Sequence, residues 1–156
     1  MLSSFLSPSS IKVALESTEK EECFAELLEV LVARNPGLNR REAMDALVAR
    51  EEKMSTAVFP MVAVPHALCS SAGDTLVALG ISRSGIEFDS PEPDVNPEHP
   101  VVNVVFEILF EEKDTETHLH VLRDILQIVS NPDFVKNVLQ AQTSQEVYDL
   151  IESMEM

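Results

Sequence analysis

The sequence is short of several residue types: its 156 residues include no tryptophan, one tyrosine, four glycines and two cysteines. Two cysteines cannot build the dense disulfide framework of a small secreted protein, and Cys23 and Cys69 are not spaced as a metal-binding pair. No apolar run approaches the ~20 residues of a membrane helix, and the first ten residues lack the basic start and apolar core of a signal peptide. We therefore expect reduced thiols, no membrane insertion and a cytoplasmic location.

Positive charge is also scarce. Eleven lysines and arginines stand against 27 aspartates and glutamates, so the formal net charge is −16. A surface of this sign repels phosphate backbones and anionic lipids, so we expect no nucleic acid partner. The acidic surface could itself bind a basic partner, although a need for solubility explains the charge equally well.

The length and composition are typical of one globular domain. A chain of this length buries roughly 70% of its unfolded surface, and 45% of the residues are hydrophobic while 24% are charged. We interpret residues 1–156 as a single domain in which residues 1–8 are flexible.

Apolar periodicity predicts the element order β-α-α-β-β-β-α-α-α. The expected strands comprise residues 11–15, 58–64, 75–82 and 101–110. Helices are expected to begin at capping boxes at Thr18, Asn39 and Thr143, and the longest helix is expected over residues 115–129. Helices at both ends of a mostly apolar set of strands predict a three-layer α/β/α sandwich with a mixed sheet of four to five strands.

An apolar run over residues 61–64 stops at Pro65, which is followed directly by His66. Because proline has no backbone N–H, a central strand cannot continue through it. We therefore expect His66 at the end of a strand, where its ring can be exposed. A neutral imidazole in this position is a candidate nucleophile.

The other three histidines differ in the surroundings that the predicted elements give them. In the predicted helix over residues 115–129, His120 shares its face with charged residues, whereas His118 borders the buried side. Two residues apart on a helix, they point in nearly opposite directions, so we expect no shared metal ion. The pattern alone favours a half-buried structural role for His118. His99 lies in a proline-rich segment over residues 90–100 and is expected to be an exposed loop residue.

Five short motifs follow one another along the chain. They are Arg50-Glu51-Glu52-Lys53-Met54, Met61-Val62-Ala63-Val64-Pro65-His66, Gly85-Ile86-Glu87-Phe88-Asp89, Thr117-His118-Leu119-His120-Val121-Leu122 and Ser144-Gln145-Glu146-Val147-Tyr148-Asp149-Leu150-Ile151. In order and spacing they resemble the enzyme IIA proteins of the bacterial phosphoenolpyruvate:sugar phosphotransferase system, in the fructose/mannitol and nitrogen-regulatory class. The last two motifs look most like the nitrogen-regulatory members.

The resemblance implies a phosphotransferase with a phosphohistidine intermediate and no cofactor. His66 would accept a phosphoryl group from the histidine of an HPr-like phosphocarrier protein. It would pass the group to a IIB component or act as a phosphorylation-dependent regulator. Arg50 and His118 would stabilise the phosphoryl charge, although composition alone favours Arg50 as a cation at a helix C-terminus. We expect a regulatory rather than a transport role because no IIB or membrane segment is attached.

The sequence departs from the family at three positions that are usually glycine, here Ala57, Phe59 and Met61. Glycine permits positive φ and close backbone approach, so we expect a loop that is shaped differently or less open. Phe59 and Met61 are expected to wall the site or dock a partner. The proline-rich segment over residues 90–100 is longer than the family's turn and is expected to alter access to the pocket. The alternative is a non-catalytic regulatory binding protein on the same fold, with His66 not phosphorylated.

Overall fold

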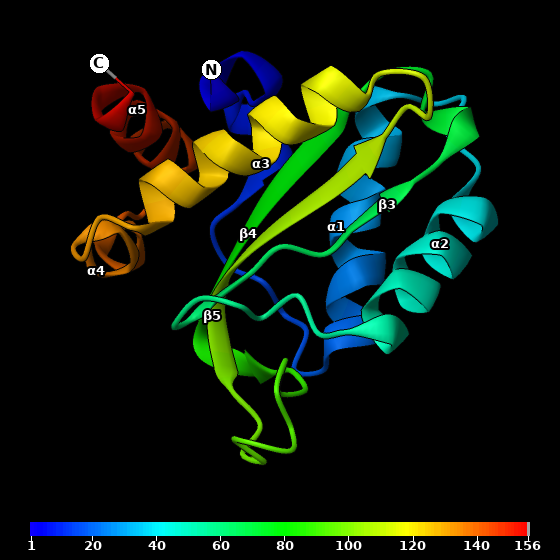
Figure 1. The fold of residues 1–156 in the computed structure, drawn as a ribbon. Helices are drawn as coiled ribbons and strands as arrows, with labels where there is room; N and C mark the ends of the chain where they lie inside the picture. The colour runs from blue at the N-terminus through cyan, green and yellow to red at the C-terminus, as the bar shows by residue number, and fades with distance from the viewer. Residues whose placement is uncertain (156) are drawn as a thin grey trace.

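A computed structural model describes residues 1–155, in which helices cover both faces of one mixed sheet (Figure 1). The strands are β1 (Ile11–Lys12), β2 (Val62–Ala63), β3 (His66–Leu68), β4 (Leu76–Glu87) and β5 (Val101–Phe110). They lie in the order β1-β4-β5-β2, and β3 pairs with β5 beyond the end of β2. Among these five strands of the described chain, only the β4–β5 pair is antiparallel. The predicted α/β sandwich with a mixed sheet is confirmed.

The helices form the two outer layers. They are α1 (Lys20–Arg34), α2 (Arg40–Lys53), α3 (Thr115–Val129), α4 (Phe134–Gln140) and α5 (Ser144–Met154). The first two cover one face of the sheet and the last three cover the other (Figure 1). Among residues 1–155, no helix is both long and apolar enough to cross a lipid bilayer.

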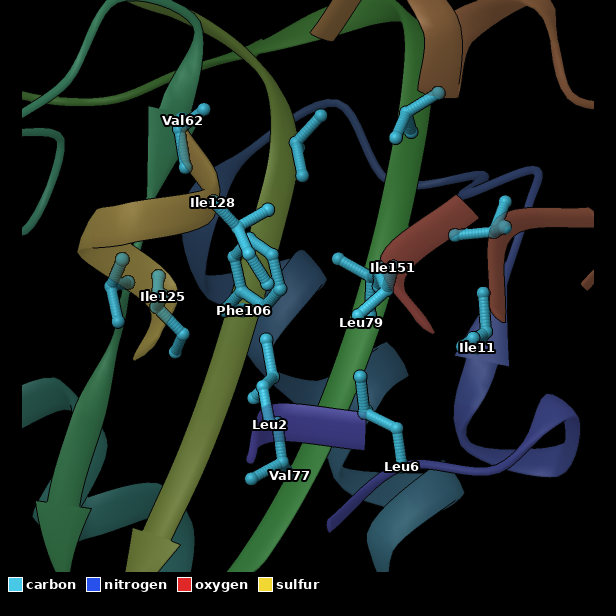
Figure 2. Close-up of a cluster of buried hydrophobic side chains, with 14 of the residues drawn as sticks. Leu2, Leu6, Ile11, Val62, Val77, Leu79, Phe106, Ile125, Ile128 and Ile151 are labelled. Carbon is cyan, nitrogen blue, oxygen red and sulfur yellow. The ribbon is translucent and has the colours of Figure 1, made fainter. Parts of the chain in front are cut away.

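Two hydrophobic cores lie on opposite faces of the sheet. Residues of β5 alternate between them, because successive side chains of a strand point to opposite faces. Phe106 and Ile108 belong to the core beneath α3 and α5, whereas Val105 and Leu109 belong to the core beneath α1 and α2. Figure 2 shows the first core, where Ile125, Ile128 and Ile151 from the helices approach Phe106 and its neighbours.

Two of the three predicted capping residues are confirmed. The side chain of Asn39 accepts the Glu42 N–H at the start of α2, and the side chain of Thr143 accepts the Glu146 N–H at the start of α5. The predicted box at Thr18 is wrong. The N-cap of α1 is Glu19, and no side chain caps the helix there.

The region around Pro65 differs from the prediction. The strand expected over residues 58–64 shrinks to β2, and the chain resumes pairing with β5 in β3, which the sequence did not predict. Pro65 interrupts the strand, but its carbonyl accepts the Ile108 N–H (2.9 Å) and keeps the chain beside β5. A proline is tolerated here because β2 and β3 lie at the edge of the sheet. The element order therefore contains one more strand than expected.

Residues 1–8 pack against the rest of the domain in this structure. A short 3-10 helix, η1 (Leu2–Phe5), is followed by a second, η2 (Pro8–Ser10). Leu2 and Leu6 are buried in the core beneath α3 and α5. The backbone N–H of Leu2 also donates to the Glu155 carboxylate (2.6 Å), which ties the two ends of the described chain together.

Candidate functional site

His66 begins β3 at the edge of the sheet, beside a pocket of about 410 Å³. Figure 1 shows β3 on the side of the sheet where α2 lies, with α3 crossing the opposite face. The pocket is lined by residues of α2, β3, β5 and α3, namely Ala46, Ala49, Arg50, Lys53, His66, Ala67, Leu68, Phe110, His118 and Leu122. The structure therefore brings together His66, Arg50 and His118, the three site residues expected from the sequence.

The ring of His66 is held in one orientation. Its Nδ1 lies 2.7 Å from the carbonyl oxygen of Val64. Since a carbonyl can only accept, Nδ1 carries the proton, and in the neutral ring the lone pair is on Nε2. Among residues 1–155, none forms a hydrogen bond with Nε2. The arrangement leaves Nε2 available as a nucleophile.

The surroundings of His66 favour its neutral form. Burial lowers the pKa of His66 below its ordinary value, and this outweighs the opposite effect of the hydrogen bond to Val64. The Arg50 guanidinium lowers the same pKa further, whereas the Glu51 carboxylate raises it. A neutral imidazole at pH 7 is the nucleophilic form.

Phe110 lies against both imidazoles of the pocket. Its ring centroid is 4.1 Å from that of His118 and 6.1 Å from that of His66. The Nε2–H of His118 donates to the Glu111 carbonyl (2.7 Å), so its Nδ1 is the nitrogen left for other contacts. His120 is exposed and does not line the pocket, which confirms the predicted facing of the two histidines.

Two cations at the end of α2 line the pocket. Arg50 Nη1 donates to the carbonyl of Met54, the C-cap of α2 (2.8 Å), so Arg50 satisfies a helix end as well as lining the pocket. Lys53, three residues later on the same helix face, was missed by the sequence analysis, although i, i+3 spacing from Arg50 identifies it. The ion pairs formed among residues 1–155 include neither of them. Both positive charges therefore face the pocket without a carboxylate partner.

In the loop before His66, a residue other than glycine adopts the left-handed backbone conformation. Met61 has φ of 67°, and the Val62 N–H donates to the Phe59 carbonyl (3.1 Å) across Pro60 and Met61. Proline followed by a residue with positive φ is typical of a type II turn, where glycine is usual in the second place. The loop thus adopts at Met61 the backbone conformation that glycine favours.

Phe59 and Met61, which were expected to wall the site, do not line the His66 pocket. Phe59 lines a separate pocket together with Pro91 and Glu92 of the proline-rich segment, and Met61 lines neither pocket. That segment precedes Val101 at one end of β5, whereas the His66 pocket lies near Phe110 at the other end. The prediction that Phe59 and Met61 wall the His66 pocket is therefore wrong. Docking of a partner by these two residues stays a prediction, as does an effect of the proline-rich segment on access.

The pocket shows no metal-type cluster. Among residues 1–155, no three His, Cys, Asp or Glu side chains are grouped so as to hold a metal ion. What the pocket does offer is a nucleophilic nitrogen, a second imidazole and two cations, a set suited to a phosphoryl group.

Comparisons with known proteins point to one family. The family model described as "Phosphoenolpyruvate-dependent sugar phosphotransferase system, EIIA 2" matches residues 4–154. The fructose-specific EIIABC component of Bacillus subtilis is 29% identical over 150 residues, which are 96% of this chain but only 23% of that protein. The nitrogen regulatory protein of Klebsiella oxytoca is 26% identical over 126 residues, 81% of this chain and 75% of the relative.

Solved structures share the fold. The nitrogen regulatory protein IIA-Ntr of Neisseria meningitidis superposes with a TM-score of 0.84 at 24% identity, covering 96% of this chain and 98% of that one. Enzyme IIA for mannitol from Escherichia coli, solved in complex with its phosphorylated IIB enzyme, gives a TM-score of 0.74 at 19% identity over 95% of this chain and 97% of that one.

Proposed function

The chain belongs to the EIIA 2 family of the phosphoenolpyruvate-dependent sugar phosphotransferase system, and from this premise we propose that His66 accepts a phosphoryl group from an HPr-like histidine phosphocarrier protein. The observation that carries the proposal is a neutral His66 whose free Nε2 lies at a pocket lined by Arg50, Lys53 and His118. The proposal treats residues 1–156 as one domain and places it in the cytoplasm with its donor.

In the proposed step, Nε2 of His66 attacks the phosphorus of the donor's phosphohistidine. A new nitrogen–phosphorus bond forms as the old one breaks, and the donor imidazole leaves with the electron pair of the broken bond. No base has to remove a proton, because Nε2 carries none. The positive charge that develops on the His66 ring strengthens the hydrogen bond from Nδ1–H to the Val64 carbonyl, so this contact stabilises the transition state.

The cations at the pocket match the charge of the transferring group. Phosphoryl transfer passes through a loose transition state in which negative charge is spread over three oxygens, so alignment and positive charge are the main requirements. The planar guanidinium of Arg50 can donate to two of these oxygens at once. Lys53 adds a second positive charge, and the free Nδ1 of His118 can donate when it is protonated.

Two partners fit the next step, and only the first of them receives the phosphoryl group. One is a IIB component, the partner with which the similar mannitol IIA enzyme was solved. The other is a target protein regulated by the phosphorylated form, and the match to nitrogen regulatory proteins supports it. Incubating the phosphorylated protein with each candidate and following loss of its phosphoryl group separates the two.

The acceptor role is tested by incubating the protein with phosphoenolpyruvate, enzyme I and the histidine phosphocarrier. We expect one acid-labile phosphoryl group per chain, seen by intact mass, and none in the His66→Ala variant. The His120→Ala variant is the matched control, because this exposed histidine does not line the pocket, and it should be labelled normally. Undiminished labelling of His66→Ala would reject the assignment, and an unlabelled wild-type protein would support the non-catalytic alternative.

A further inference from the structure

A buried carboxylate holds the segment that leads to His66. Glu51 lies in α2 and is only 5% exposed. Its Oε1 accepts the backbone N–H of Thr56 (2.9 Å), and its Oε2 accepts the hydroxyl of Thr56 (2.8 Å). Both carboxylate oxygens therefore bind the same residue, which fixes Thr56 relative to the end of the helix.

Two further hydrogen bonds connect Thr56 to the imidazole. The carbonyl of Thr56 accepts the N–H of Val64 (3.1 Å), and the carbonyl of Val64 accepts the Nδ1–H of His66 (2.7 Å). Thr56 is 3% exposed and Val64 is 6% exposed. Because these groups are shielded from solvent, water cannot easily replace a partner that is lost. A continuous series of hydrogen bonds thus runs from Glu51 to His66.

We infer that Glu51 is a positioning residue for His66, acting through Thr56 and Val64 to hold the ring in the tautomer that leaves Nε2 unprotonated. This inference rests on the proposed function only in taking Nε2 as the phosphoryl acceptor. A neutral imidazole can carry its proton on either nitrogen, and the hydrogen bond made by one nitrogen decides which. Displacement of the Val64 carbonyl would release the Nε2–H form, in which Nε2 has no free lone pair with which to attack phosphorus.

Substitutions can separate the effect of the hydrogen bonds made by Glu51 from the effect of its charge. Glutamine can still accept the Thr56 N–H through its amide oxygen and donate its NH2 to the Thr56 hydroxyl, so it preserves the geometry without the charge. Alanine removes both. Glu52, the exposed neighbour of Glu51 on α2, provides the matched control in the Glu52→Ala variant.

The primary measurement is the tautomer of His66 in the unphosphorylated protein, read from the ring nitrogen shifts and two-bond couplings of 15N-histidine-labelled samples. Wild type and Glu52→Ala should show the Nδ1–H form at neutral pH. Glu51→Ala should show a mixture of both forms and accept phosphoryl groups about tenfold to hundredfold more slowly, the size of effect that follows from a misplaced reactive group. Glu51→Gln should keep the wild-type tautomer and a rate close to wild type, with a lower pKa of His66.

Two results would overturn the inference. One is an Nε2–H tautomer in the wild-type protein. The other is a folded Glu51→Ala variant with an unchanged tautomer and an unchanged rate. If Glu51→Ala does not fold, Glu51→Met fills the same space without accepting a hydrogen bond and takes its place. The tautomer is read without any phosphoryl donor, so a wild-type protein that cannot be phosphorylated refutes the proposed function separately.

Discussion

Arg50 contacts both the C-terminal end of α2 and the His66 pocket. Its guanidinium donates to the Met54 carbonyl, lines the pocket with His66, and lowers the pKa of that histidine. A cation at a helix C-terminus contributes about 0.3–1 kcal/mol to the free energy of folding. Losing that amount would leave the protein folded, so it could not explain a large loss of phosphoryl transfer. The structural and the catalytic contributions can therefore be measured separately on one residue.

We predict that Arg50→Ala loses at most about 1 kcal/mol of folding free energy but loses phosphoryl transfer by orders of magnitude, because the transition-state contact is absent from the resting protein. The pKa of His66 should rise toward its ordinary value. Arg50→Lys should restore stability and only part of the rate, since it keeps the charge without the planar fork. Thermal melts, transfer kinetics and an NMR titration check these outcomes. Wild-type kinetics in Arg50→Ala would remove this residue from the site.

The two histidines of α3 give a second prediction. His118→Ala should slow transfer by about tenfold to hundredfold, which corresponds to the loss of one hydrogen bond to a charged group, about 1.5–3 kcal/mol. His120→Ala should leave the rate unchanged because this side chain is exposed outside the pocket. Transfer rates from phosphorylated carrier protein measure both. Equal losses in the two variants would contradict the assignment of His118.

Glu107 is a buried residue that the proposed reaction does not use. Its carboxyl lies fully buried in β5 with no hydrogen-bonding partner among the described residues, and burial raises its pKa well above the ordinary value. The folded protein therefore binds this proton more tightly than the unfolded chain does. The contribution of Glu107 to stability is complete below its unfolded pKa and is lost as the pH rises through its folded pKa.

Glu107→Met should therefore be more stable than wild type at neutral pH. An unpartnered buried polar group costs about 1–3 kcal/mol, and methionine fills a similar volume without one. The gain should shrink as the pH falls toward the unfolded pKa of the carboxyl. Urea unfolding at several pH values gives the two stability curves, with exposed Glu112→Met as the control. A gain that is absent or independent of pH would contradict this account of the buried carboxyl.

At the scale of elements, the turn before β2 carries backbone strain. Met61 holds a positive φ in the turn closed by Phe59 and Val62, and the left-handed conformation costs a non-glycine residue about 1–2 kcal/mol. We predict that Met61→Gly is more stable than Met61→Ala by about 1 kcal/mol, because both remove the side chain and only glycine relieves the strain. Chemical denaturation measures the difference. An alanine variant that equals or exceeds glycine in stability would show that the turn is not strained.

The elements that sequence reasoning predicted correctly are those with strong local signals. The bounds of α3 and β5 agree with the expected residues 115–129 and 101–110, and Asn39 and Thr143 cap the helices they precede. The short strand β3 was missed because three residues show no periodicity, and only pairing with β5 defines them. Thr18 matched a capping box but does not cap α1, which begins after Glu19.

The site residues that belong to a recognisable motif could be predicted from the sequence. The Pro65-His66 motif singled out His66, and family spacing singled out Arg50 and His118, and all three line one pocket. Glu51 could not be assigned a role, because the path from its carboxylate to the ring runs through Thr56 and Val64 and depends on how the loop folds back.

At the scale of the whole molecule, the pocket forms at the sheet edge, where α2 and α3 contribute residues from opposite layers. The chain carries a net charge of −16, yet within residues 1–155 neither Arg50 nor Lys53, which line this pocket, forms an ion pair with a carboxylate. The positive charge of these two side chains is of the sign that attracts a phosphoryl group to this pocket.

The central claim is that Nε2 of His66 receives the phosphoryl group while Nδ1 keeps its proton. The most direct test is NMR of the 15N-histidine-labelled protein after phosphorylation by the carrier, in which phosphorus–nitrogen coupling and the ring shifts identify the substituted nitrogen. The account predicts phosphorus on Nε2 of His66, with Nδ1–H still donating to the Val64 carbonyl. A phosphoryl group on Nδ1 of His66, on another residue, or on no residue would contradict it.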